Sequence, residues 1–194
     1  MFDWLMELAK PGPDTKVLDV GVTNDWRSDS NFFEKLYPYP GNITAVGMED
    51  CAFLETEFPG LKFVQSDGKQ LPFPDDSFDL CVSFAVLEHV GSSDQQKVFV
   101  DELFRVSKKV CLTTPNRWYP LEFHTMLPFA HWLPGDQFRK IAKMIGKEFL
   151  AREENLNLLD SASVQALLPA GAKVTSRYYR LLGPVSNLFF YVEA

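Results

Sequence analysis

The sequence predicts an α/β protein built on a mainly parallel, seven-stranded sheet. Short apolar runs, typical of buried strands, alternate with helical stretches along the first part of the chain. Such alternation implies right-handed crossovers between parallel strands. The last two apolar runs are separated by Gly183 and Pro184, which favour a hairpin turn and therefore an antiparallel edge. At 194 residues, the chain fits one domain spanning 1–194.

The predicted elements follow from residue type and period. Strands are expected at 16–20, 43–47, 61–65, 78–84, 109–113, 173–182 and 186–193. Helices are expected at 2–9, 29–37, 51–58, 94–107, 138–150 and 161–168. In the helix at 94–107, Val98, Leu103 and Val106 are expected to face the same way. Ser161 is a suitable N-cap for the last helix.

Composition narrows the class of protein. A net charge of −7 argues against a protein that tracks nucleic-acid phosphates, which needs a basic surface. Cys51, Cys81 and Cys111 show no CxxC spacing and are interpreted as reduced core residues. The N-terminal stretch MFDWLMELAKPGPD lacks the features of a signal peptide, and no apolar run is long enough to span a bilayer. We therefore expect a cytoplasmic protein without an integral membrane segment.

Ligands of parallel α/β sheets bind at the carboxyl ends of the strands, so the loops that follow the strands are the candidate binding segments. Gly21 directly follows the first strand in VLDVGVTND and could let the backbone approach a ligand, with Asp19 at the strand end. A single glycine is weaker than the three of a dinucleotide fingerprint, and a tight turn explains it equally well. Asp67 and Gly68 follow the third strand, where the carboxylate could accept from a purine amine, although Asp-Gly is also a common turn pair.

The specific signal is the block LPFPDDSFDL at 71–80 followed by VLEHV at 86–90. With VLDVG at 17–21, SDG at 66–68 and TTPNR at 113–117, the chain resembles the class I S-adenosylmethionine-dependent methyltransferases, specifically the small-molecule group called methyltransferase type 11. TTPNR is also similar to the end of the fifth strand in ubiquinone-type O-methyltransferases. The resemblance runs from about residue 16 to the C-terminus. It implies a Rossmann-like sheet with helices on both faces and S-adenosyl-L-methionine as the cofactor.

The resemblance also implies roles for individual residues. Asp19 and Gly21 would approach the methionine end of the cofactor. Asp67 would face the adenine amine, with Gly68 beside it. The residues expected to line the sulfonium and adenine region are Ser83, Phe84 and Ala85.

Two departures from the family pattern stand out. The family's GxGxG loop reads GVTND here, so that Thr23 and Asp25 replace the second and third glycines. The acidic residue that usually holds the ribose hydroxyls at the end of strand two is Gly47 in this chain. Glu49 is the nearest substitute and Asp50 the next. Either these carboxylates reach the ribose from a reshaped loop, which we favour, or cofactor affinity is reduced.

The candidate catalytic residues are His124, His89 and Tyr119, because proton transfer near neutral pH suits histidine. A base is optional in methyl transfer, since orientation supplies much of the acceleration. His89 belongs to VLEHV, where a packing role is the commoner one. A metal site from Glu122, His124 and His131 matches no standard ligand spacing, so no metal is expected.

An insertion at 115–150 is expected to shape the acceptor site. Its aromatic, proline-rich segment RWYPLEFHTMLPFAHWLP is interpreted as a pocket wall rather than pure packing. The predicted function is methyl transfer to an oxygen or nitrogen of a small-molecule or lipid-linked acceptor. The alternative is a catalytically inactive relative that binds or regulates, and the missing GxGxxG disfavours an NAD-dependent oxidoreductase. Nothing in the sequence fixes the oligomeric state, and a homodimer stays open.

Overall fold

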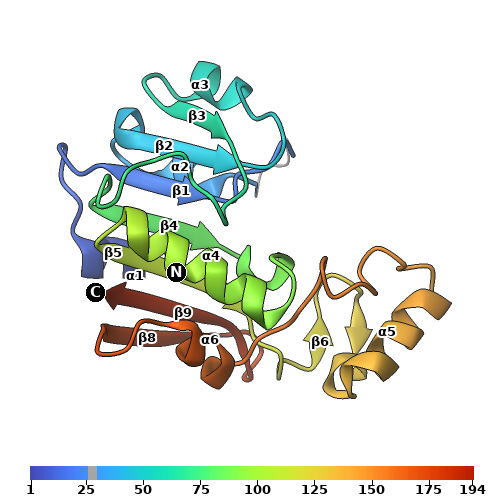
Figure 1. Cartoon of the computed structure of the whole chain (residues 1–194). Coiled ribbons are helices and arrows are strands. Elements are labelled where there is room, and N and C mark those ends of the chain that lie inside the picture. The colour runs from blue at the N-terminus through green and yellow to red at the C-terminus, as the bar shows by residue number, and fades with distance from the viewer. Residues whose placement is uncertain (26–29) are drawn as a thin grey trace.

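The computed structural model describes residues 1–25 and 30–194, and its centre is a seven-stranded sheet of order β3-β2-β1-β4-β5-β9-β8 (Figure 1). The strands are β1 (Val17–Val20), β2 (Ile43–Gly47), β3 (Lys62–Gln65), β4 (Leu80–Phe84), β5 (Lys109–Pro115), β8 (Lys173–Arg180) and β9 (Val185–Glu193). The first five run parallel to their neighbours, whereas β9 pairs antiparallel with both β5 and β8. The predicted parallel sheet with an antiparallel C-terminal hairpin is confirmed.

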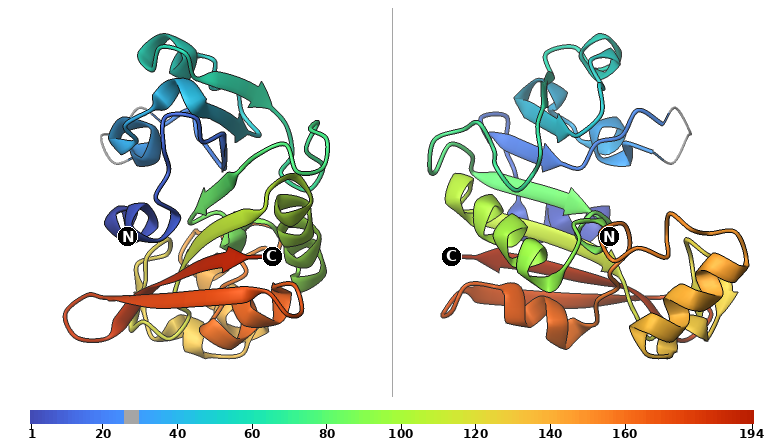
Figure 2. Two further views of the ribbon diagram at one scale, coloured as in Figure 1. Left: turned by 90° about the vertical axis from the view of Figure 1, so that its left-hand side faces the viewer. Right: turned by 45° about the vertical axis from the view of Figure 1, so that its right-hand side comes forward.

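Helices cover both faces of this sheet. The longer ones are α1 (Phe2–Ala9), α2 (Phe32–Leu36), α3 (Phe53–Glu57), α4 (Ser93–Val106), α5 (Gly135–Met144) and α6 (Ser161–Leu167). Figure 2 shows α1 and α2 on one face, with α4 and α6 on the other. Successive strand side chains point to opposite faces, so Cys111 joins the core beneath α1 while its neighbour Leu112 joins the core beneath α4. Part of the helix predicted at 29–37 lies outside the described residues.

The core-facing stripe of α4 differs from the expectation. Leu103 and Val106 are fully buried as predicted, but Val98 is 51% exposed. Phe99 and Val100 occupy the core positions instead. The buried residues follow the i, i+3, i+4, i+7 pattern of a helix face, and Val98 falls outside it. The expectation that Val98 faces the core is therefore wrong.

The caps of α4 and α6 also became clear only in the structure. Ser92 and Gln95 form a capping box at the start of α4, in which each side chain accepts from the other residue's backbone N–H. At α6 the N-cap is Asp160, whose carboxylate accepts from the N–H of Ser163 at 2.8 Å. Ser161, the predicted cap, is instead the first helical residue. Asp160 is the better acceptor because it carries a charge near the helix N-terminus.

Residues 116–160 leave the sheet between β5 and α6, and we call them the β5–α6 excursion. It contains the small sheet β6 (Leu121–Glu122) and β7 (Leu127–Pro128), the 3-10 helix η3 (Ala130–Trp132) and α5. The excursion lies at the edge toward which the parallel strands point, beside the 3-10 helix η2 (Leu87–His89) (Figure 1). Another 3-10 helix, η1 (Pro40–Asn42), precedes β2.

Two further expectations concern burial and membranes. The three cysteines are buried and carry free thiols, as expected of reduced core residues. Within the described residues, none of the helices combines the length and apolar character needed to cross a membrane.

Candidate functional site

The loop after β1 crosses the carboxyl ends of β2 and β4 at Gly21. The Gly21 N–H donates to the carbonyl oxygen of Val46 at 2.8 Å, and its φ of +119° favours glycine. A Cβ at this position would lie 2.1 Å from Cγ2 of Val86. The glycine therefore keeps the backbone open between two cavities, because Gly21 lines both of them.

The first cavity has a volume of about 530 Å³, within the usual range for a small-molecule site. It opens at the carboxyl ends of β1, β2 and β3 and against η2 and α4. Of the candidate residues from the sequence, Gly21, Asp67, Gly68 and His89 line it together. The expected meeting of the loops after strands one and three is thus present.

Asp67 follows β3 and belongs to the lining of this cavity. Its Oδ1 accepts from the N–H of Lys69 at 3.0 Å, and its Oδ2 lies 3.5 Å from Nζ of the same lysine. The side chain is 48% exposed, and each carboxylate oxygen can accept one more hydrogen bond. Gly68 packs tightly, since a Cβ there would lie 2.5 Å from Cε2 of Phe99. The absence of a side chain at Gly68 lets the loop rest on α4 and holds Asp67 at the cavity.

The second cavity, about 220 Å³, has an acidic pair in its lining. Asp19 at the end of β1 and Glu34 in α2 are 5% and 1% exposed. Burial, reinforced by the neighbouring Glu34, raises the pKa of Asp19 well above its usual range, and burial raises the pKa of Glu34 too. Phe84 and Ala85, the predicted sulfonium-side residues, line the same cavity. This pair suits a cationic group, which would compensate the buried carboxylates.

The reshaped loop after Gly21 is held by side chains in place of the missing glycines. Asn31 accepts from the N–H of Thr23 at 3.1 Å and donates to the Thr23 carbonyl at 2.8 Å. The Thr23 hydroxyl oxygen in turn accepts from the N–H of Asp25 at 3.0 Å. These contacts hold the loop after Gly21 without the second and third glycines of the GxGxG pattern.

The expected ribose contact through Glu49 finds no support in the geometry. A Cβ on Gly47 would lie 2.6 Å from the carbonyl oxygen of Val22, so this loop leaves no room for the family's acidic side chain. Glu49 is exposed and belongs to the lining of neither cavity. The carboxylates that do line the first cavity are Asp67 and Glu154. No period or motif along the chain points to Glu154.

Ser83, another predicted cofactor residue, has a structural contact instead. Its side chain is buried, and its hydroxyl donates to the carbonyl oxygen of Val20 at 2.9 Å. This bond ties β4 to β1 beneath the site. Ser83 does not line either cavity.

A cluster of polar side chains joins η2 to the β5–α6 excursion. Nε2 of His89 lies 3.1 Å from Nε2 of His124, and Nδ1 of His124 lies 2.7 Å from Glu122. Burial alone would raise the pKa of Glu122, but hydrogen bonds from His124 and Thr125 lower it to about 2. Burial raises the pKa of Glu88, which lies in the same cluster. His131, which the sequence grouped with Glu122, lies apart with its Nε2 at 2.8 Å from a backbone carbonyl.

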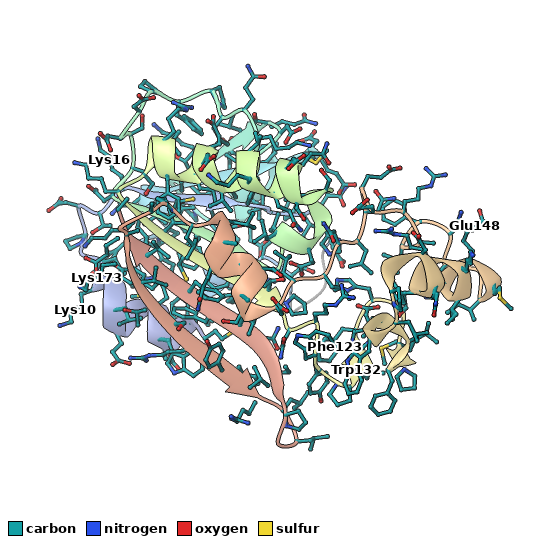
Figure 3. All side chains as sticks on the ribbon, turned by 60° about the horizontal axis from the view of Figure 1, so that its bottom comes forward. Lys10, Lys16, Phe123, Trp132, Glu148 and Lys173 are labelled. Atoms are coloured by element: carbon teal, nitrogen blue, oxygen red, sulfur yellow. The ribbon has the colours of Figure 1, made fainter. Side chains whose placement is uncertain are left out.

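Tyr119 belongs to the packing of the excursion. It is 7% exposed and stacks on Phe123 with ring centroids 5.1 Å apart, and it lines neither cavity. Figure 3 shows Phe123 and Trp132 within the excursion, apart from the main sheet. The excursion residues that line the first cavity are Phe149, Glu154 and Asn155, largely beyond the limits of the predicted insertion.

Comparisons with known proteins agree with this architecture. Residues 32–110 match a family model described as a methyltransferase domain, the type 11 group. Two curated relatives from Mycobacterium leprae, strains Br4923 and TN, are each called an uncharacterized methyltransferase. Each is 32% identical over an alignment of 111 residues, and the match covers 54% of this chain and 38% of the relative. The chain thus spans well under half of the length of the curated relatives that it matches.

Solved structures extend the likeness to the whole fold. An S-adenosylmethionine-dependent methyltransferase from Mesorhizobium loti superposes with a TM-score of 0.67 at 14% identity, over 100% of this chain and 98% of that one. A methyltransferase of the same kind from Methanosarcina mazei gives 0.60 at 16% identity, over 94% and 93%. At these identities the likeness shows the fold. The family model over residues 32–110, the curated relatives and the fold together support a class I S-adenosylmethionine-dependent methyltransferase domain.

Proposed function

We propose that this chain binds S-adenosyl-L-methionine across the two cavities and catalyses methyl transfer to an oxygen or nitrogen of a small-molecule or lipid-linked acceptor. The observation that carries the proposal is Gly21, which lines both cavities at the carboxyl ends of β1 and β4. One cavity offers Asp67 and the other offers Asp19 and Glu34. Their chemistry fits the two ends of the cofactor, a nucleoside and an amino acid.

Different residues of the chain suit the nucleoside end and the amino-acid end of the cofactor. The Asp67 carboxylate has free acceptor capacity for an exocyclic amine, and Glu154 offers a second carboxylate for hydroxyls. The buried acids Asp19 and Glu34 suit the ammonium group of the methionine end. Gly47 leaves no space for an acidic side chain at the end of β2, so the ribose contact must come from another part of the chain. Glu154, which lines the first cavity, is the candidate for that contact.

When bound, the cofactor would supply an electrophilic methyl group, whose bond to the sulfonium sulfur breaks as the acceptor lone pair bonds to its carbon, so that S-adenosylhomocysteine leaves and the acceptor loses a proton. The contribution of the chain is orientation and exclusion of water, which account for much of such a rate enhancement. His89 lines the first cavity and contacts His124, so the pair is the candidate proton acceptor. Tyr119, which is buried against Phe123, is a weaker candidate for a direct role.

Binding calorimetry with S-adenosylhomocysteine, with NAD as the comparison, tests the cofactor. We expect the first ligand to bind and NAD not to bind at the same concentration. Glu154→Gln should weaken binding, whereas Glu153→Gln should not, because Glu153 pairs with Arg139 at 3.4 Å outside the cavity lining. No heat of binding at millimolar S-adenosylhomocysteine, with a folded protein, contradicts the proposal.

A second function, cofactor binding without turnover, is favoured by the closed Gly47 position and the single loop glycine. It predicts that S-adenosylhomocysteine binds but that no acceptor in a metabolite extract gains a labelled methyl group. Transfer of label from S-adenosylmethionine to any extracted compound, lost in Asp67→Asn, supports the enzyme over the binding protein.

A further inference from the structure

Two imidazole rings from distant parts of the chain point their Nε2 atoms at each other. His89 in η2 and His124, between β6 and β7, are 3.1 Å apart at these atoms. Nδ1 of His89 lies 2.7 Å from the carbonyl oxygen of Asn155, and Nδ1 of His124 lies 2.7 Å from Oε1 of Glu122. A backbone carbonyl only accepts, and the Glu122 carboxylate already accepts from the N–H groups of His124 and Thr125, so both Nδ1 atoms carry the hydrogen. In neutral rings, both Nε2 atoms then present lone pairs to one another.

A buried carboxylate completes this arrangement. Oε2 of Glu88 accepts from the Thr114 hydroxyl at 3.0 Å, while Oε1 is buried with no hydrogen-bond partner within residues 1–25 and 30–194. One ligand atom each from Glu88, His89 and His124 lies within 4.8 Å of the other two. Three electron-pair donors that converge in this way repel one another unless a proton or a metal ion lies between them.

We propose that Glu88, His89 and His124 bind one divalent transition-metal ion, with Zn²⁺ as the best match. Two nitrogen ligands of tetrahedral zinc, each at about 2.0–2.1 Å from the ion, are about 3.3 Å apart. The observed 3.1 Å between the Nε2 atoms is close to that separation. Two imidazoles and one carboxylate form a known catalytic ligand set, in which a further position stays open.

The contacts behind the ligands have the pattern of a metal site. Metal-binding histidines usually donate their other N–H to a carboxylate or a backbone carbonyl, which fixes the ring and its tautomer. Both arrangements are present here, through Glu122 and the Asn155 carbonyl. Glu122 is itself held by the N–H and hydroxyl of Thr125, each at 2.6 Å, and is 3% exposed. The rings are therefore oriented before any ion binds.

The location of the three ligands gives the ion access from solvent and a role beyond cofactor binding. His89 is exposed and lines the first cavity, so an ion can enter from solvent and lies at the margin of that cavity. An open coordination position there would accept an oxygen ligand, from water or from a hydroxyl-bearing acceptor. The metal site itself requires no methyltransferase activity.

Calorimetry with Zn²⁺ alone on chelator-treated, full-length protein tests the proposal, with Mn²⁺ as a second ion. We expect one Zn²⁺ per chain and a raised melting temperature on binding. His89→Asn and His124→Asn should abolish stoichiometric binding. The control is His131→Asn, which removes the remaining histidine of the chain, outside the cluster, and should retain it.

Glu122→Gln tests whether Glu122 orients a metal ligand, because a purely structural role of Glu122 would leave Zn²⁺ affinity unchanged. It keeps the side-chain shape but weakens the orientation of His124, so Zn²⁺ affinity should fall about 10–100-fold. Co²⁺ bound by the wild type should show visible ligand-field bands that the two histidine variants lack.

Several outcomes would overturn the proposal. One is that the folded wild type does not bind Zn²⁺ stoichiometrically. Another is that both His89→Asn and His124→Asn bind Zn²⁺ as the wild type does. With either result, a single proton shared between the two rings is the better explanation of their contact. S-adenosylhomocysteine binding, measured in chelator, separates the two proposals, because cofactor binding without Zn²⁺ binding refutes only the metal site.

Discussion

Gly47 offers a direct test of how this chain departs from the methyltransferase family that it resembles. The family pattern implies that Gly47→Asp should restore a ribose contact and tighten cofactor binding. The structure predicts the opposite, because the Cβ would lie 2.6 Å from the carbonyl oxygen of Val22. That contact involves backbone, which cannot rotate away as a side chain can. The loop after β1 would have to shift, and Gly21 with it.

The size of the effect follows from the contact. Overpacking of this kind costs about 1–3 kcal/mol, and each kcal/mol lowers the melting temperature of a chain of this length by about 2–4 °C. Gly47→Ala should therefore melt about 2–12 °C below the wild type. Gly47→Asp should lose at least as much, and its affinity for S-adenosylhomocysteine should fall.

Thermal melting and calorimetry check both variants. Gly12→Ala is the matched control, since a Cβ on Gly12 meets nothing within 4 Å. It should melt at or slightly above the wild type, because alanine restricts the unfolded chain. A Gly47→Ala protein as stable as Gly12→Ala, or a Gly47→Asp protein that binds the ligand more tightly, would refute the steric explanation.

Three further predictions rest on separate contacts. Asp67→Asn should weaken S-adenosylhomocysteine binding roughly tenfold or more, because it removes a charged acceptor. Asp101→Asn, on the surface of α4, is the control. Equal affinities of the two variants in calorimetry would contradict the adenine contact. The raised pKa values of Asp19 and Glu34 mean that the folded chain keeps a proton that the unfolded chain releases above about pH 4, so stability falls as pH rises through the folded pKa. Glu34→Gln should flatten this dependence, and urea unfolding at pH 5 and pH 8 should show a smaller difference than in the wild type; an unchanged difference opposes the buried pair. Asp160→Ala should cost about 0.5–2 kcal/mol through loss of the α6 cap, while Ser161→Ala costs less, and the reverse order of melting temperatures would restore Ser161 as the cap.

The fold could be predicted because its strands are short, apolar and regularly spaced. The five parallel strands and the hairpin at 173–193 follow from local composition alone. The predictions were wrong where two neighbouring residues are equally suited to the same structural position. Val98 and Phe99 are both apolar, and only the contact of α4 with the sheet selects Phe99. Asp160 and Ser161 are both good caps, and the helix start decides between them.

The candidate site was less predictable, because its residues meet only through tertiary structure. Asp67 and Gly21 follow strands and could be found by position along the chain. Glu34 lies in a short helix and becomes a site residue only because α2 packs over the end of β1. His89 and His124 are 35 residues apart, a separation that matches no metal-binding spacing. Spacing along the chain therefore predicts no metal, whereas the geometry of Glu88, His89 and His124 supports a metal site.

The proposed cofactor site spans both cavities, which share Gly21 in their linings. A crystal structure with S-adenosylhomocysteine is the decisive measurement. We expect the adenine beside Asp67, the sulfur near Gly21, and the ammonium group facing Asp19 and Glu34. A ligand bound elsewhere, or one whose amino-acid end points away from the second cavity, would refute the proposed site.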